Sequence, residues 1–315
     1  MIGYTLRRLV QAVVVLLGVT VLVFVLEHII PGNLARAVLG PRASTGEMAN
    51  FDRVNGLGRP VVMQYLTFLS HVLHGNLGYS YRLNQSVDSL VVHELPNDLI
   101  LVGIALVLAL AIAIPLGVAQ AVRRNGALDH AATGVALLVY SMPSYWLGLL
   151  LIAGMAIGLH ALPPEAPQAA TVAGVLANPR ALVLPVLTLT LVNVALFSRY
   201  MRSAAIDTLA QDYVRVARAK GLPARVIVAR HVLRNSLAPV VTLLGLSIPA
   251  VLTTGLVVEY VFNFPGLGLT YFNAAVNADY PVELGITVIA GVATVLGSLL
   301  ADLAYAVLDP RVRYG

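Results

Sequence analysis

The sequence offers few side chains in an arrangement that could carry out a reaction. His93-Glu94-Leu95-Pro96-Asn97 begins like the helix of a zinc protease, in which two histidines bind the metal and the glutamate acts as a base. The second histidine is missing, and Pro96 would break the helix that must present both ligands. We therefore expect neither an intramembrane protease nor a metal site.

Other catalytic patterns are also missing from the sequence. Since the chain has no cysteine, it has no disulfide, no thiolate metal site and no cysteine nucleophile. It has no Gly-x-Ser-x-Gly elbow that would present a nucleophilic serine. It also lacks the glycine-rich loop with Lys and Ser/Thr that cradles phosphates, so we do not expect it to hydrolyse ATP. The sequence indicates a protein that is not an enzyme.

The composition indicates that a membrane surrounds most of the chain. Of the 315 residues, 58% are hydrophobic and 11% are charged, whereas a soluble domain has about 25% charged residues. The net charge of +5 comes from basic residues that cluster at the ends of apolar stretches, which is the pattern of a bilayer protein rather than of a nucleic-acid-binding one.

Six stretches reach the length of about 20 apolar residues that a spanning helix needs. The third is long enough to tilt or to kink at Pro143. The first has too long an apolar core for a signal peptide, and Glu27-His28 intervene before the possible cleavage site. We predict an all-α polytopic membrane protein with six transmembrane helices. The predicted spans are Leu9–Ile30, Leu99–Val122, Ala131–Leu159, Ala181–Met201, Leu237–Phe262 and Leu284–Leu308.

The distribution of Arg and Lys predicts that both termini are cytoplasmic. In that orientation the two short outer loops, 160–180 and 263–281, share only Arg180, as the positive-inside rule requires. Most of the 20 basic residues then lie on the inner side. These are Arg7, Arg8, Arg123, Arg124, Arg199, Arg202, Arg215, Arg218, Lys220, Arg225, Arg230, Arg234, Arg311 and Arg313.

Two connections are too long to be simple turns. The outer one contains a predicted amphipathic helix at Val61–Val72 and should form a small ordered cap. We divide the chain into residues 1–30 with the first span, an external segment at 31–98 and a core at 99–315. The core includes a basic cytoplasmic segment at 202–236.

The cytoplasmic segment is predicted to be two helices joined by a tight turn. Apolar residues recur at helical spacing from Asp207 to Lys220, and Gly221 follows where a helix end needs a left-handed residue. Pro223 suits the first turn of a second helix, which re-enters the membrane near Pro239. This shape suits insertion into a groove on a cytoplasmic partner, or binding of the basic helix to anionic lipid, and the pattern alone leaves both open.

Two adjoining motifs in this segment resemble those of a known family. Residues 217–222, Ala-Arg-Ala-Lys-Gly-Leu, and 230–239, Arg-His-Val-Leu-Arg-Asn-Ser-Leu-Ala-Pro, look like the coupling motif of type I ATP-binding-cassette importer permeases. More narrowly, they are similar to the form found in B-type dipeptide/oligopeptide permeases. In the wider family the motif starts Glu-Ala-Ala, and here Ala217, Ala219 and Gly221 stand without the Glu.

The resemblance extends over nearly the whole chain, with matching motifs in the same order. One departure is Gly58, where the subgroup often has an acidic residue before its Arg-Pro pair. The further motifs are Leu57-Gly58-Arg59-Pro60 with Gln64-Tyr65, Gly75-Asn76-Leu77-Gly78, Ile114-Pro115-Leu116-Gly117, Ser141-Met142-Pro143-Ser144-Tyr145-Trp146-Leu147-Gly148, Val258-Glu259-Tyr260-Val261-Phe262 with Pro265-Gly266-Leu267-Gly268, Asp302-Leu303 through Tyr305, and Leu308-Asp309-Pro310-Arg311.

The resemblance implies the type I importer permease fold and a multi-subunit importer of the bacterial inner membrane. This chain would form half of the translocation pathway beside a homologous C-type permease, within membrane lipid. Two ATP-binding subunits inside would bind ATP and magnesium, an external substrate-binding protein would deliver peptides, and this chain itself would hold no cofactor. The subgroup also includes importers of nickel chelates, glutathione and haem, so the resemblance leaves the substrate open.

The resemblance also implies which residues couple the chain to the ATPases, and the positions of charged residues near the ends of the spans indicate further candidates. The ATPase-coupling set is Tyr213, Ala217, Arg218, Ala219, Lys220, Gly221, Leu222, His231, Asn235 and Pro239. Glu27, His28, Glu259 and Phe262 are candidates for the substrate pathway. The charged ones either extend to the interface without a role or line the outer vestibule and meet a peptide's amino group. For Asp302, near the inner end of the last span, we favour a structural hydrogen-bonding role.

Two other classes of function remain as alternatives. A secondary transporter that works without an ATPase would have acids or broken helices near the middle of the bilayer and repeated halves. The sequence shows few charges within its spans and no evident repeat. A scaffold that binds lipid through the basic inner helix alone is the third possibility.

Overall fold

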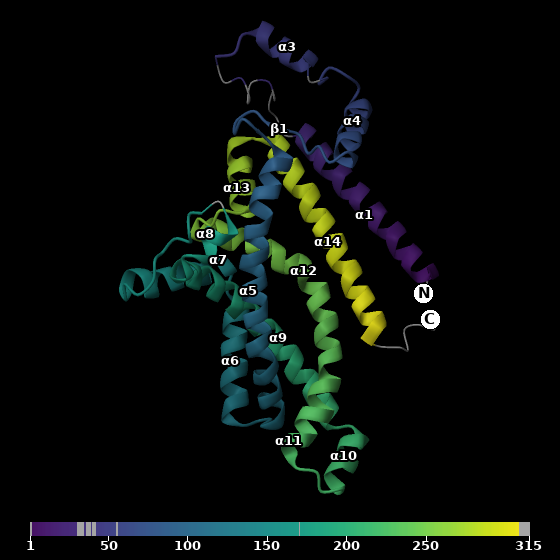
Figure 1. Cartoon of the computed structure of the whole chain (residues 1–315), viewed down its shortest axis with the longest axis vertical. Coiled ribbons are helices and arrows are strands. Elements are labelled where there is room, and N and C mark those ends of the chain that lie inside the picture. Colours follow the sequence, from purple (N-terminus) through teal and green to yellow (C-terminus); the bar gives the residue numbers. More distant parts are fainter. Residues whose placement is uncertain are drawn as a thin grey trace. The chain divides into compact units, whose positions relative to one another are not determined.

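The described part of the chain is mostly helical, as the sequence predicts (Figure 1). The computed structural model describes residues 2–29, 35, 39, 42–54, 56–169 and 171–308. Within them, the only strands are β1 (Tyr79–Ser80) and β2 (Gln85–Ser86), which pair antiparallel with Tyr79 opposite Ser86. The contacts divide the chain into two compact units, one of Met1–Pro96 with Pro265–Val295 and one of Asn97–Phe264 with Leu296–Gly315. The division at residues 30/31 and 98/99 stays a prediction.

The first unit contains α1 (Ile2–Ile29), α3 (Thr45–Val54), α4 (Val61–Leu73), the β-hairpin, the start of α5 (Val87–Val122), α13 (Leu267–Asn277) and most of α14 (Tyr280–Leu308). The helix expected at Val61–Val72 is confirmed as α4. Its Tyr65 hydroxyl lies 3.0 Å from Thr20 Oγ1 of α1. The hairpin is tied to the turn before α14 by a 2.5 Å hydrogen bond from Ser80 Oγ to Asp279. The apolar core of the unit consists of Val87, Leu90, Val91, Leu267, Ala274, Val282 and Ile286.

The second unit begins with the remainder of α5 and continues through α6 (Ala127–Ser141), α7 (Ser144–Leu151), the π-helix η1 (Ile152–Gly158), α8 (Val172–Leu176) and α9 (Pro179–Leu209). It ends with α10 (Asp212–Ala219), α11 (Ala224–Val226), the π-helix η2 (Ile227–Leu233) and α12 (Arg234–Phe262). It has two apolar cores, one around Leu184, Leu189 and Phe262 and one around Phe197, Met201 and Val232. Because α9 contributes to both cores and packs against α12, it is the central helix of this unit.

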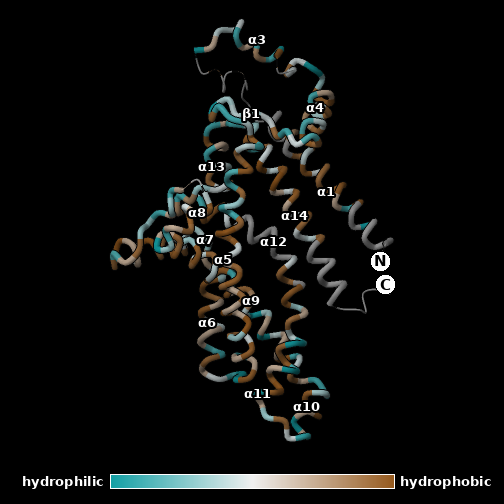
Figure 2. Tube along the Cα trace, viewed as in Figure 1, coloured by the Kyte–Doolittle hydropathy of each residue, from teal (hydrophilic) through white to brown (hydrophobic). Residues whose placement is uncertain are grey.

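Four helices in the described residues are long and apolar enough to cross a membrane: Val87–Val122, Pro179–Leu209, Ala224–Gly245 and Tyr280–Leu299. Figure 2 shows the apolar residues along α5 and α9. α6 and α7–η1 make a fifth span if they are counted together, but they are bent by 107° across Met142-Pro143. The kink expected at Pro143 is therefore confirmed, and it is a full break. α1 contributes the shorter apolar stretch Val10–Leu22, and the count of six spans stays a prediction.

The expectation that Pro96 breaks a helix was wrong, because α5 runs through it from Val87 to Val122. Proline has no N–H, so the carbonyl of Val92 loses its partner one turn earlier. Both Val92 and Pro96 are exposed, so that carbonyl can be satisfied from outside the fold. On either side of the proline, buried Val91 and Leu101 hold the helix in place.

α5 and α9 approach each other closely at Gly117. A Cβ atom added there would lie 2.7 Å from Met201 Cβ and 2.8 Å from the Ser198 carbonyl oxygen, both on α9. Such distances are too short for real contacts, so any larger residue would push the two helices apart.

We predict that Gly117→Ala destabilises the protein by about 1–3 kcal/mol, because the methyl group has no space between the helices. Gly103→Ala is the matched control, since it lies on the same helix and a Cβ there meets nothing within 4 Å. The thermal unfolding midpoint of the purified protein measures the difference. Equal midpoints for the two variants would show that α5 and α9 are not packed at this distance.

Candidate functional site

The segment between α9 and α12 begins with a short helix, α10, which lies against the end of α9 and the start of α12. The expectation of one helix from Asp207 to Lys220 was wrong: α9 continues to Leu209, Ala210 and Gln211 form a turn, and α10 begins at Asp212. Gln211 is extended, with φ −70° and ψ 148°. The break lets the last turn of α9 and one face of α10 bury their apolar residues in the same cluster, which a straight helix could not do.

The C-terminal end of α10 has the backbone geometry expected for Gly221. Its φ is +76°, in the left-handed region that favours glycine. The Gly221 N–H donates to the Arg218 carbonyl at 2.9 Å, and the Leu222 N–H donates to the Ala217 carbonyl at 3.3 Å. These two bonds form a Schellman motif, which satisfies carbonyls that the helix end would leave without partners.

The chain then returns as a continuous helical run through α11, η2 and α12. Pro223 directly precedes α11 and is extended, with φ −61° and ψ 144°, so it lies one residue before the predicted first turn. The π-helical turns of η2 were not predicted, because apolar spacing does not distinguish them from α-helix. Pro239 lies exposed within α12, past its first turn.

An apolar cluster fixes α10 in place. Val214 and Ala217 are buried against Ile227 and Val232 of η2. α9 supplies Met201 and Ala205 to the same cluster. Ala217 of the predicted coupling set thus has a packing role.

Polar contacts link the predicted coupling residues across the turn. Asn235 Nδ2 donates to the Tyr213 hydroxyl at 3.0 Å, and the Tyr213 and His231 rings lie 6.3 Å apart. The structure therefore brings these three residues together. Ser236 and Thr208 were not among the predicted site residues, yet their hydroxyl oxygens lie 3.0 Å apart and are buried. The sequence signal for Ser236 was its place inside the second motif.

The outward side of α10 and its turn is a continuous exposed surface. Tyr213, Val216 and Leu222 are 42%, 52% and 39% exposed. Arg218, Ala219, Lys220 and Gly221 are also exposed. We call this set of seven residues the α10 surface. Apolar side chains are thus presented together with positive charge, on a helix whose other face is buried.

The predicted pathway residues lie elsewhere. Glu259 is 1% exposed and Phe262 is fully buried, both in α12. Phe262 packs in the core beside Gly148, where an added Cβ would lie 3.1 Å from the ring. The side chains of Glu27, His28 and Asp302 lie outside the described residues. The substrate-pathway role of Glu27, His28, Glu259 and Phe262 stays a prediction, as does the structural role of Asp302.

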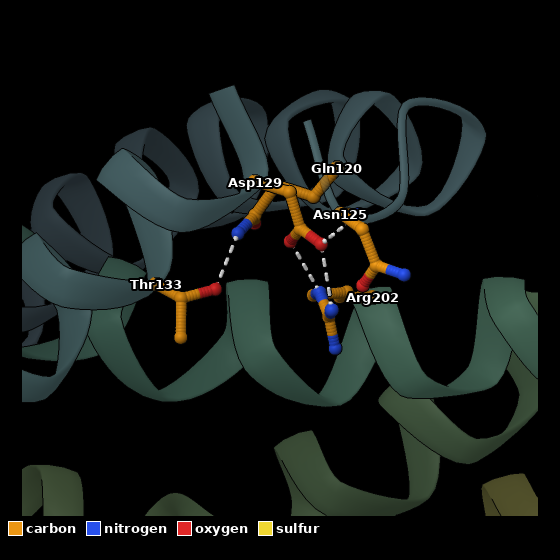
Figure 3. A network of polar contacts seen from close by, with 5 residues as sticks. All are labelled: Gln120, Asn125, Asp129, Thr133 and Arg202. Atoms are coloured by element: carbon orange, nitrogen blue, oxygen red, sulfur yellow. Dashed lines mark hydrogen bonds and ion pairs between the residues drawn. The ribbon is translucent and has the colours of Figure 1, made fainter. Parts of the chain in front are cut away.

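A second polar cluster joins α6 to α9 and was not predicted (Figure 3). Arg202 donates from Nε and Nη2 to the two carboxylate oxygens of Asp129, at 2.6 and 2.7 Å. The Asn125 N–H also donates to Asp129, at 2.9 Å. Gln120 Nε2 donates to Thr133 Oγ1 at 3.2 Å. No local pattern in the sequence pairs residues 73 positions apart.

Comparison with known proteins identifies the family. Residues 113–314 match the family described as the binding-protein-dependent transport system inner membrane component, and residues 1–102 match the N-terminal family of such membrane components. The chain belongs to this family. The permease motifs noted in the sequence, including the turn around Gly221, lie within these two matched regions.

Several relatives match this family member over its full length. It is 36% identical to the oligopeptide transport system permease protein AppB of Bacillus subtilis, covering 100% of each chain. It is 39% identical to a putative peptide permease protein of Brucella suis biovar 1, covering 99% of each. It is 33% identical to the dipeptide transport system permease protein DppB of Escherichia coli, covering 100% of this chain and 99% of that one.

We predict that Gly221→Val loosens the end of α10. A β-branched residue in the left-handed region costs about 1 kcal/mol or more, and a Cβ there meets nothing within 4 Å, so the cost comes from backbone strain alone. Trypsin should then cleave after Arg218 and Lys220 several-fold faster. Gly221→Asn is the control, because asparagine tolerates this conformation. If the valine variant were cleaved no faster than the asparagine variant, the turn would not depend on this conformation.

Proposed function

We propose that this chain is the permease subunit of an ATP-driven importer of peptides and forms half of its translocation pathway. The observation that carries this proposal is the full-length match to permease proteins named for oligopeptide and dipeptide transport. The family supplies the class, an inner membrane component of a binding-protein-dependent system.

The α10 surface is the proposed docking site for the ATPase. The opposite face of α10 is buried against α9 and η2, so a force on α10 acts on both adjoining helices. The α10 surface itself presents Tyr213, Val216 and Leu222 to a partner. We infer that closure of the ATPases on ATP moves α10 as a rigid lever and rotates the spans.

The partners follow from the class of transport system. A homologous C-type permease would complete the pathway, two ATP-binding subunits would hold ATP and magnesium, and an external binding protein would deliver substrate. This chain would then be a non-catalytic subunit without a cofactor of its own.

The importer can be tested by reconstituting the chain with its co-expressed partners in vesicles. We expect uptake of a labelled dipeptide or oligopeptide to require ATP and the binding protein. Val216→Glu should abolish both ATPase co-purification and uptake, because it places a charge in the proposed apolar contact. Ala127→Glu is the control: it adds the same charge at an exposed position in the first turn of α6, where an acid is favourable.

Three outcomes would contradict parts of this proposal. A chain that purifies alone and moves substrate under a proton gradient would be a secondary transporter. ATP-dependent uptake of haem, a nickel chelate or glutathione but no peptide would keep the class and change the substrate. Unaltered ATPase binding by Val216→Glu would exclude α10 as the docking site.

The proposed orientation places both termini and α10 in the cytoplasm. Because the chain has no cysteine, single cysteines can be labelled without background. We expect a membrane-impermeant maleimide added outside intact spheroplasts to label Arg82→Cys but not Lys220→Cys, both at exposed positions. Permeabilised cells provide the control, since both variants should then be labelled. The reverse labelling pattern in intact cells would show that the topology is the opposite of the one proposed.

A further inference from the structure

A polar pocket of about 420 Å³ lies between α6 and α9, near the Asp129–Arg202 cluster. Its lining comes from one stripe on each helix. Thr133 and Tyr140 are seven residues apart on α6, and Leu196, Arg199, Tyr200 and Ser203 have the spacing of one face on α9. The coupling function proposed above uses none of these side chains.

Arg202 is held in a fixed orientation at one side of this pocket. Its Nε and Nη2 atoms donate to Asp129, a residue that is 2% exposed and whose carboxylate also accepts from the Asn125 N–H. Within the described residues, Nη1 of Arg202 has no hydrogen-bond acceptor, and Arg202 lines the pocket. A buried carboxylate thus positions the guanidinium through two hydrogen bonds (Figure 3), which leaves Nη1 to bind an anion.

Arg199 adds a second guanidinium one helical turn away. It lies over the Tyr140 ring, 5.2 Å from the centroid, and the described part of the chain gives it no carboxylate partner. Asp129 therefore neutralises Arg202, and the pocket keeps the one positive charge of Arg199. Tyr140, Tyr200 and Ser203 are exposed and bring hydroxyl donors to the same place.

The surroundings of the pocket are those of a membrane interface. Leu137 lies between Thr133 and Tyr140 on α6 and is 47% exposed, and Leu196 forms part of the wall. Tyrosines are enriched where a bilayer meets water, and basic pockets between spanning helices on the cytoplasmic side bind anionic headgroups. A soluble anion would not use the adjacent apolar side chains.

We propose that this pocket binds an anionic phospholipid, with its phosphodiester between Arg199 and Arg202 and an acyl chain along Leu137 and Leu196. The single negative charge of such a headgroup matches the single excess positive charge of the site. The assignment to the inner leaflet rests on the orientation proposed above; the binding chemistry does not.

Native mass spectrometry of the complete purified complex tests the site. After delipidation, the complex is titrated with phosphatidylglycerol or with phosphatidylcholine. We expect tight binding of phosphatidylglycerol only, and about tenfold weaker binding in Arg199→Gln, because a charge-assisted hydrogen bond to the phosphate is lost. Arg124→Gln is the matched control, as it removes an exposed arginine on the neighbouring turn that does not line the pocket.

Further measurements distinguish the lipid from other occupants of the pocket. Inorganic phosphate or glycerol phosphate that displaced the lipid at equal concentration would make this a site for a soluble anion. If Arg199→Gln separated the permease subunits while lipid binding was unchanged, the partner permease would cover the pocket. Equal lipid affinity in Arg199→Gln and Arg124→Gln would also overturn the proposal.

A second variant keeps the test valid if Arg199→Gln does not assemble. Tyr200→Phe removes only one exposed hydroxyl and should weaken phosphatidylglycerol binding several-fold; unchanged binding in this variant would count against the site. Since lipid binding is the readout, failure of peptide uptake would bear on the proposed function and not on this pocket.

Discussion

Burial of one face of α10 is the interaction on which the inner end of this protein depends. Isolated helices shorter than about 12 residues are marginal in water, and α10 has 8. Its stability must come from packing, and fully burying one aliphatic side chain contributes about 1.5–3 kcal/mol. In α10, Val214 makes such a contribution and Ala217 adds a smaller one from its buried methyl group, both in the cluster with Met201 of α9 and Val232 of η2. The same contacts mean that α10 cannot shift without moving the ends of α9 and η2.

Polar contacts extend this connection beyond the apolar cluster. Ser236 at the start of α12 contacts Thr208 at the end of α9, so the two helices are joined directly as well as through α10. Arg202, about two turns before Thr208 on α9, donates two hydrogen bonds to Asp129 of α6. Removing Arg202 would be costly because it would leave Asp129, which is 2% exposed, as an uncompensated charge. A displacement of α9 therefore carries the first turn of α6 with it.

The sequence predicted those features that depend on local chemistry. Gly221 was placed correctly in the left-handed region because a helix end followed by Pro223 leaves few other solutions, and α4 was found from its apolar spacing. The break at Ala210–Gln211 was missed because apolar residues continue at helical spacing on both sides, and only packing against η2 selects the bend. The predicted helix break at Pro96 was wrong because a proline leaves one carbonyl without its helical partner, and the sequence does not show whether that carbonyl is exposed. The Asp129–Arg202 pair depends on α6 lying beside α9, which no local pattern specifies.

α9 has two faces with different roles. Met201, Ala205 and Thr208 recur at helical spacing and are buried toward the coupling segment, whereas Arg199 and Ser203 face outward into the pocket beside α6. Arg202 lies between these faces, and without Asp129 its charge would repel that of Arg199 one helical turn away. The pairing removes this repulsion and fixes the guanidinium plane at the same time. A single carboxylate in the first turn of α6 thus both joins two helices and leaves the outer face of α9 with one net positive charge, which is why the ion pair and the pocket occur at the same level of the helix.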